Sequence, residues 1–289
     1  MKRIACVLLA VQLAVAVPAR AADGSIPPEP GFSLSSRIDW GAGTVAVEIT
    51  RSLDPSVAST VRAKGDAETD IESRLPGFLA RAVAPLVVDS SHTFGDLLGS
   101  DPGLFARVRA LFDGARRDAL FLSADFSSLV ARYTIPLFGE RGIILPLLHS
   151  KANPIRRALP YVTTRNYTGL LIYARGALPE SGTTRTAAAR PALFPRIWDE
   201  QMNLVLEKGM CFPESLARWG MVGYAASIDD AATLRAGALP LRLAARGVFG
   251  DHGTDIVIST DGARQLLSLA ENIALLQEGR ICIVYDSLE

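Results

Sequence analysis

The chain of 289 residues carries 30 Lys and Arg against 30 Asp and Glu, and 49% of its residues are hydrophobic. This balance of charge excludes the electrostatic attraction on which binding to nucleic acid or to an anionic membrane surface depends. The apolar content excludes disorder throughout the chain and suffices for one large domain or two small ones.

Residues 1–21 have the pattern of a secretory signal peptide. Two basic residues precede an apolar run over residues 4–17, and small residues follow it, so we expect cleavage between Ala21 and Ala22. The apolar run is shorter than the roughly 20 residues that span a bilayer; the alternative is an uncleaved membrane anchor. We therefore expect an exported protein of the periplasm or the outer-membrane periphery that is not integral to the membrane after cleavage.

Residues 22–150 predict an N-terminal α+β region. We expect helices over 54–74, 78–88 and 100–113, and strands over 39–50, 119–124 and 129–137. Asp54 is expected to cap the first helix, and Pro76 to break or kink the chain before the second. Residues 125–128 are typical of a hairpin turn between the last two strands.

A basic, Pro-bearing stretch over residues 151–160 is a possible linker to a sheet-rich C-terminal α+β region, residues 161–289. We expect helices over 213–219 and 261–277, and strands over 167–174, 193–198, 204–206, 221–225, 240–248, 255–259 and 281–285. The strand at 167–174 is expected to be central, with 193–198 as its hairpin partner across a mobile loop. The fold class predicted for the whole chain is α+β, with largely antiparallel sheets packed by a few helices.

The strongest chemical cluster is Asp251, His252 and Asp255. These residues could supply a general base with its orienting carboxylate, as in a secreted hydrolase, or oxygen ligands for a cation. The alternative is a polar turn between two strands, in which Asp and Gly serve the turn conformation. The sequence has no phosphate-binding glycine loop and no Gly-x-Ser-x-Gly motif, so an enzyme is less favoured than a non-enzymatic protein.

Arg175, Arg196 and Asp199 are weaker candidates for ligand contact. The two arginines could bind a small anion such as a carboxylate, but arginines at strand ends more often pair with acids. Asp199 and Glu200 are paired acids, which suggests glycosidase chemistry, but adjacent residues of a strand face opposite ways and the pair is also typical of a solvated turn.

Cysteine and histidine usage predicts neither a metal site nor a cofactor. The three histidines are far apart in sequence and no Cys-x-x-Cys pair is present. Cys211 and Cys282 follow the signal peptide, so in an oxidising compartment they could form a disulfide. The alternative is two buried, unpaired thiols.

Residues 167–176 (YTGLLIYARG) and 191–200 (PALFPRIWDE) carry a resemblance. With residues 240–247 and 254–259, they resemble a group of uncharacterised secreted bacterial proteins. The chain departs from that pattern at Tyr173, where the group has an acid. The group is distantly similar to outer-membrane lipoproteins linked to flagellar assembly, and it implies no particular activity.

These observations favour a non-enzymatic cell-envelope protein that acts through contacts with an envelope protein partner. Two alternatives remain open. One is a periplasmic small-anion binder that uses Arg175 and Arg196, and the other is a secreted hydrolase that uses Asp251, His252 and Asp255.

Overall fold

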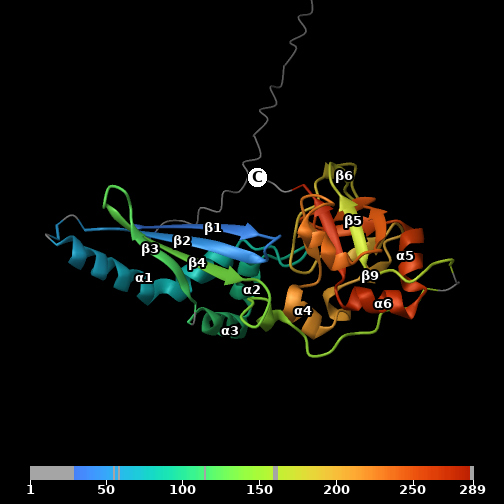
Figure 1. Ribbon diagram of the computed structural model, residues 1–289, viewed down its shortest axis with the longest axis horizontal. Helices are drawn as coiled ribbons and strands as arrows, with labels where there is room; N and C mark the ends of the chain where they lie inside the picture. The colour runs from blue at the N-terminus through green and yellow to red at the C-terminus, as the bar shows by residue number, and fades with distance from the viewer. Residues whose placement is uncertain (1–28, 55, 58, 114, 159–161, 287–289) are drawn as a thin grey trace, which may run out of the picture.

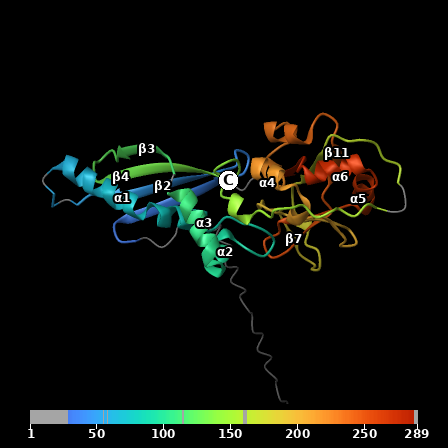
Figure 2. The ribbon, with the colours of Figure 1, turned by 90° about the horizontal axis from the view of Figure 1, so that it is seen from below.

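The computed structural model describes residues 29–286, except residues 55, 58, 114 and 159–161. The chain forms two lobes side by side along its longest axis (Figures 1 and 2). The N-terminal lobe, residues 29–144, and the C-terminal lobe, residues 170–286, are joined by a connector, residues 145–169. The expected signal peptide, with cleavage between Ala21 and Ala22, lies outside the described residues. Among the described residues, no helix combines the length and the apolar character that crossing a membrane requires.

One antiparallel sheet organises the N-terminal lobe. Its strand order is β1 (Phe32–Asp39), β2 (Thr44–Ser52), β4 (Ser128–Pro136) and β3 (Arg117–Leu122). Buried and more exposed residues alternate along β2, so Val45, Val47 and Ile49 point into the core. The expected hairpin between the last two strands is confirmed, because β3 and β4 pair antiparallel.

The long helix α1 (Thr60–Val83) lies along one face of this sheet (Figure 1). The prediction of a cap at Asp54 was wrong: Ser59 caps the helix, and the Asp54 carboxylate instead accepts a hydrogen bond from the Ser56 backbone. The predicted break at Pro76 was also wrong. Pro76 removes a backbone donor, but buried residues on both sides, such as Ile71 and Phe78, pack against the core and maintain the helix.

Two shorter helices, α2 (Phe94–Ser100) and α3 (Pro102–Phe112), complete the N-terminal lobe. Asp101 caps α3 by accepting hydrogen bonds from the backbone of Gly103 and Leu104, as expected for Asp before Pro. The sequence reading missed α2. Its signal was present in the sequence, because Thr93 and Asp96 form a capping box.

The main sheet of the C-terminal lobe is parallel. Its strand order is β10 (Gly223–Ala225), β14 (Ile281–Tyr285), β5 (Leu170–Ala174) and β11 (Leu241–Ala244). Side chains pack on both faces: Leu170 and Ile172 join the large core, while Leu171 and Cys282 join a smaller cluster behind the sheet. Burial on both faces explains why these strands read as unbroken apolar runs.

The C-terminal lobe contains a second four-stranded sheet. Its order is β12 (Gly247–Phe249), β13 (Asp255–Ile258), β8 (Ile197–Asp199) and β9 (Leu204–Leu206). The predicted pairing of 167–174 with 193–198 was therefore wrong, since β5 and β8 belong to different sheets. The stretch 177–192 contains a small hairpin of its own, β6 (Leu178–Pro179) with β7 (Thr186–Ala187).

Short helices cover the C-terminal sheets. They are α4 (Pro213–Trp219), α5 (Thr260–Leu267), α6 (Ala270–Gln277) and the 3-10 helices η2 (Lys208–Met210) and η3 (Ala231–Ala236). The single helix expected over 261–277 is divided into α5 and α6. Between them the Ser268 carbonyl accepts a hydrogen bond from the Arg157 side chain, and at the start of α6 the buried Asn272 side chain accepts one from the Tyr167 backbone N–H. The α+β class is confirmed, and antiparallel pairing predominates across the molecule, although the main C-terminal sheet is parallel.

The connector contains η1 (Leu145–Leu147), and its backbone forms hydrogen bonds with the C-terminal lobe. Asn153 N–H donates to the Gly209 carbonyl at 2.7 Å, within the stretch that was expected to be a linker. The lobes also contact each other directly: Leu193 and Phe194 N–H donate to the carbonyls of Val87 and Val88 at 3.1 and 2.8 Å. One continuous hydrophobic core includes residues of both lobes.

Candidate functional site

The three ligand-contact residues predicted from the sequence do not meet in the structure. The Arg175 side chain donates to the Asp286 carboxylate at 2.6 Å. Arg196 lies 3.9 Å from the Glu207 carboxylate. Asp199 is buried, and its carboxylate accepts hydrogen bonds from Gln201 and Asn203 in its own turn. Each residue therefore has a structural partner of its own within the described part of the chain.

Asp255 and His252 belong to the junction between the lobes. The Asp255 carboxylate accepts hydrogen bonds from Arg196 N–H at 3.0 Å and from the Trp198 indole at 3.1 Å. Burial raises the pKa of Asp255 above its usual value. The backbone N–H of His252 donates to the Ser90 carbonyl in the other lobe, and no hydrogen bond joins the His252 ring to Asp251 or Asp255 in the described structure. The base and its orienting carboxylate are thus not assembled as a pair.

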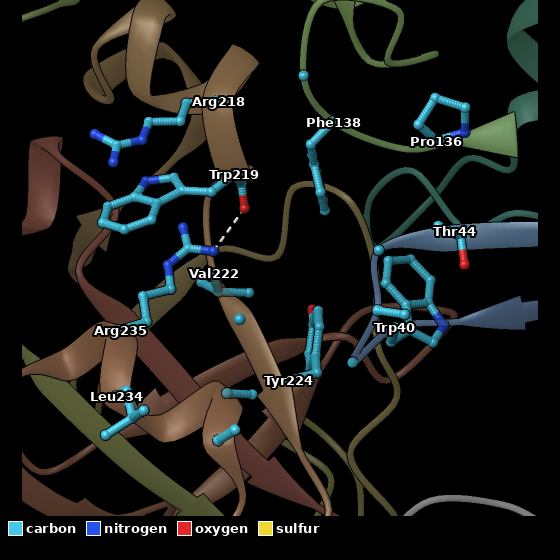
Figure 3. A pocket seen from close by; sticks show the side chains of 17 residues that line it. Trp40, Thr44, Pro136, Phe138, Arg218, Trp219, Val222, Tyr224, Leu234 and Arg235 are labelled. Carbon is cyan, nitrogen blue, oxygen red and sulfur yellow. Dashed lines mark hydrogen bonds between the residues drawn. The ribbon is translucent and has the colours of Figure 1, made fainter.

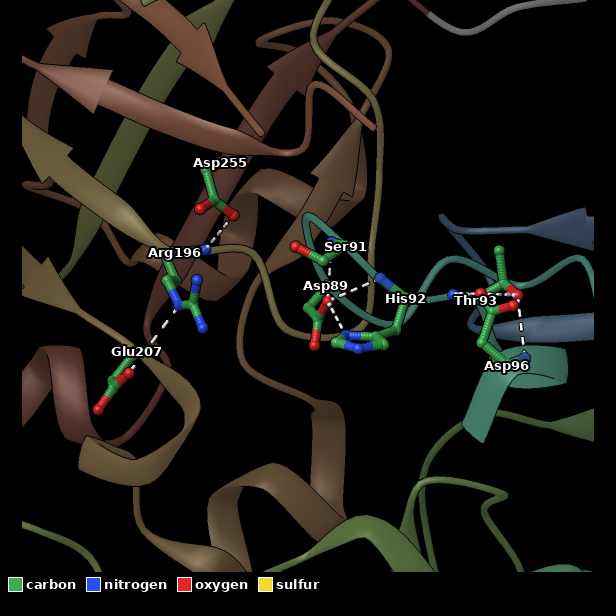
Figure 4. A network of polar contacts seen from close by, with 8 residues as sticks. All are labelled: Asp89, Ser91, His92, Thr93, Asp96, Arg196, Glu207 and Asp255. Atoms are coloured by element: carbon green, nitrogen blue, oxygen red, sulfur yellow. Dashed lines mark hydrogen bonds and ion pairs between the residues drawn. The ribbon is translucent and has the colours of Figure 1, made fainter. Parts of the chain in front are cut away.

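The loop before α2 enters the junction, and its own side chains hold its shape (Figure 4). The Asp89 carboxylate accepts hydrogen bonds from the backbone of Ser91 and His92 at 2.9 Å, and the His92 ring lies 3.0 Å away. Next to it, Thr93 and Asp96 form their capping box, and these bonds lower the pKa of Asp96. The loop is therefore a preformed element of the interface between the lobes.

Cys211 and Cys282 are free and buried, so the structure shows the unpaired thiols and not the disulfide. Burial raises the pKa of each thiol to about 12, which makes both unreactive at neutral pH. No group of three His, Cys, Asp or Glu among the described residues could hold a metal ion.

A cleft of about 610 Å³ opens between the lobes, within the range of ligand-binding pockets (Figure 3). Its N-terminal wall is the β1–β2 turn and the segment after β4, and its C-terminal wall is built from α4, β10 and η3. The lining residues come from four stretches of sequence: Trp40–Thr44, Pro136–Gly139, Arg218–Tyr224 and Ala231–Arg235.

Aromatic side chains and arginines give the cleft its chemistry. Figure 3 shows the Trp219 indole between the Arg218 and Arg235 side chains, whose guanidinium carbons lie 5.1 and 4.7 Å from the ring. Phe138 and Tyr224 lie on the other side. Trp40 contacts Tyr224 edge-on across the junction, with ring centroids 5.4 Å apart. Such a surface can bind apolar or aromatic groups, but it contains no nucleophile–base pair.

Arg235 is held by three hydrogen bonds at the C-terminal end of α4. Its guanidinium donates to the carbonyls of Gly279 and Trp219 at 2.6 Å each and to that of Gly220 at 2.5 Å. Burial lowers the pKa of Arg235 to about 10, so the side chain remains charged at neutral pH. Carbonyl acceptors at a helix C-terminus suit a cation, and Arg235 therefore stabilises the end of α4.

The sequence reading missed this cleft. Its four stretches are up to about 190 residues apart in the chain, and none contains a recognisable motif. The only local signal was Arg218-Trp219-Gly220, a cation and an aromatic side chain at a glycine-terminated helix.

Fold and site together define a two-lobed α+β protein with an aromatic, arginine-bearing cleft at the lobe junction. Residues 31–140 match a family model described as the N-terminal domain of Treponema pallidum Tp0624. Residues 169–287 match the model described as the second domain of the same protein. The two matches fall on the two lobes in the same order, and they indicate an uncharacterised bacterial family. No curated protein matches the chain.

Proposed function

We propose that this is an exported, non-enzymatic protein of the cell envelope that binds a partner at the cleft between its lobes. The observation that carries the proposal is the cleft itself: an open, aromatic surface of about 610 Å³ at the junction of two lobes. Aromatic and arginine side chains are the types that contribute most to recognition.

Export to the periplasm or the outer-membrane periphery rests on the signal-like pattern of residues 1–21. The same location is supported by the resemblance of residues 167–200 to secreted bacterial proteins and by the distant similarity to flagellar-assembly lipoproteins. The test is the N-terminal sequence of protein isolated from cell fractions. A mature chain that begins at Ala22 in the periplasmic or envelope fraction is expected, and an intact N-terminus in the cytoplasm would contradict export.

Binding is preferred to hydrolysis because Asp255 is engaged by Arg196 and Trp198, and no ring contact joins it to His252. Binding of a small anion at Arg175 is also less favoured, because Asp286 already neutralises that side chain.

Site-specific photocrosslinking in living cells tests the binding site. Leu234 lines the cleft and is 78% exposed, whereas Phe126, in the β3–β4 turn away from the cleft, is 65% exposed and serves as the matched control. A photoreactive residue at 234 is expected to form a discrete crosslinked species that is absent at 126. Equal crosslinking at both positions, or none at 234, would contradict a partner at the cleft.

A further inference from the structure

The charges at the junction cleft have one sign. Among the described residues that line it, the only charged side chains are Arg218 and Arg235, and no Asp or Glu is present. A concave, partly apolar wall strengthens the field of the charges set in it. The adjacent acids Asp39 and Asp230 accept hydrogen bonds from the backbone N–H groups of Ala42 and Ala232. The arginine-bearing wall of the cleft therefore favours a ligand with negative charge.

Neither arginine has a carboxylate partner within the described structure. Two other arginines of the C-terminal lobe do: Arg280 is paired with Glu278 at 2.7 Å and Arg196 with Glu207 at 3.9 Å. The contacts of Arg235 are carbonyls, which satisfy its N–H groups but carry no full negative charge. A net positive charge remains at the base of the cleft.

Arg218 is the cation that a ligand can reach. It is exposed, it lies over the Trp219 ring, and no hydrogen bond from its guanidinium occurs in the described structure. Stacking on an aromatic ring limits its motion while leaving its planar edge of donors available. A carboxylate can accept two parallel hydrogen bonds from such an edge.

The other lining residues of the cleft favour a ligand whose remaining part is apolar. Trp40 and Phe138 contribute aromatic surface from the N-terminal wall, and Leu234, next to Arg235 on η3, is largely exposed on the opposite wall. The Trp219 indole N–H is already bonded to the Glu278 carbonyl. The cleft offers no lysine among its lining residues, and the Arg235 donors are already bonded to carbonyls, which leaves one arginine to bind an anion and suits a singly charged carboxylate better than phosphate.

We infer that the cleft binds a carboxylate attached to an apolar or aromatic body, with Arg218 as its direct partner and Arg235 as a second, fixed positive charge. Two sources share this chemistry: the carboxyl terminus of a protein chain that ends in an aromatic residue, and a free aromatic acid. The inference rests on the proposed function in one respect, because it takes the junction cleft to be the binding site.

Calorimetry on the purified protein that begins at Ala22 tests the inference with paired probes. The probes are an N-acetylated tetrapeptide ending in phenylalanine, as the free acid and as the amide, together with indole-3-acetate, indole-3-acetamide and inorganic phosphate. At least one acid is expected to bind about tenfold or more tightly than its amide, because a hydrogen-bonded charge is lost. Binding of the peptide acid alone assigns the ligand to a chain terminus, and binding of indole-3-acetate alone assigns it to a free acid.

The variant Arg218→Gln should remove the preference for acid over amide without changing the melting temperature. Arg242→Gln is the matched control. Arg242 is an exposed arginine on β11, the edge strand of the main C-terminal sheet that lies opposite to β10, which lines the cleft. Equal binding of acids and amides, tighter binding of phosphate, binding of none of the probes, or a preference that survives in Arg218→Gln would overturn the inference. Crosslinking at residue 234 is read separately, so a partner found there without acid selectivity would leave the proposed function standing.

Discussion

The two lobes bury their sheets in different ways. The N-terminal sheet is antiparallel, and its strands alternate between buried and exposed residues because α1 covers one face. The main C-terminal sheet is parallel, and Ile281, Cys282, Ile283 and Val284 are all buried because both faces are packed. The N-terminal lobe thus keeps one polar face of its sheet open. The C-terminal lobe covers both faces of its main sheet and meets the other lobe through β10 and through loops such as the one at Leu193 and Phe194.

The difference also shows how the lobes depend on each other. The β1–β2 turn of the N-terminal lobe supplies Trp40, which packs on Tyr224 of the C-terminal lobe. Tyr224 is itself anchored through its hydroxyl to the Ala192 backbone at 2.9 Å. Because the core continues across the junction, the lobes should behave as one cooperative unit, and the cleft should keep its shape.

The strongest test of that continuity is Phe78→Ala. Phe78 is buried under the N-terminal sheet and contacts Phe32 at 4.9 Å between ring centroids. The substitution should lower the free energy of unfolding by about 3–5 kcal/mol because it leaves a cavity. Hydrogen exchange of β4 and β5 amides measures the effect in each lobe. Both should lose protection together, and loss in β4 alone would show that the lobes unfold separately. Phe105→Ala, at a 40% exposed side chain, is the control.

Arg235→Ala should have the next largest effect, a loss of about 2–4 kcal/mol in the free energy of unfolding, because three carbonyls lose their charged donor. Urea denaturation measures it. Arg218→Ala, at the exposed arginine on the other side of Trp219, should leave stability nearly unchanged. Similar losses for the two variants would show that Arg235 is not the structural arginine of the cleft.

Gly220→Ala tests the contact between the lobes at the cleft. Gly220 has φ +79° and ψ −179°, a conformation that side chains rarely adopt, and an added Cβ would meet the Phe138 ring. We expect a loss of about 1–3 kcal/mol from strain and crowding. Gly182 also has positive φ, at +86°, but its Cβ would meet open space. Gly182→Ala is the control for strain alone. If thermal unfolding shows equal losses of stability for Gly182→Ala and Gly220→Ala, the Phe138 ring does not restrict the space at Gly220.

Asp286→Asn should have the smallest effect. The Arg175 hydrogen bond, followed by that of Gly176 N–H, lowers the pKa of Asp286 below its ordinary value of 3.8. A lowered pKa in the folded state means that the contribution to stability is present above pH 3.8 and is lost as the pH falls through the folded-state pKa. The melting temperature of the variant should therefore be slightly lower than that of the wild type at neutral pH and should converge with it in acid. A difference in melting temperature that stays constant from neutral pH to acid would argue against the ion pair.

Local patterns predicted single elements better than the pairing of strands. The β3–β4 hairpin and the helix over 213–219 depend on neighbouring residues, and both were confirmed. Pairing of β5 with β14 and β11 joins residues up to about 110 positions apart, and an apolar run such as 170–174 does not specify its neighbours. The expected hairpin with 193–198 failed for this reason.

The functional candidates show the same division. Arg175, Arg196 and Asp255 stood out in the sequence because charged residues near strand ends can serve a ligand, but their partners Asp286, Glu207 and Trp198 become visible only in the folded chain. Arg218 drew no attention in the sequence. It became a candidate because folding placed it in a cleft without an acid.

The sequence by itself determined the α+β class, the positions of most strands, and the expectation of export, because these depend on composition and on residues a few positions apart. The tertiary structure alone decided which strands are neighbours, which charges are paired, and that four separate stretches form one cleft. The physical reason is that burial and ion pairing are properties of surroundings, and those surroundings are assembled from residues that are distant in the chain.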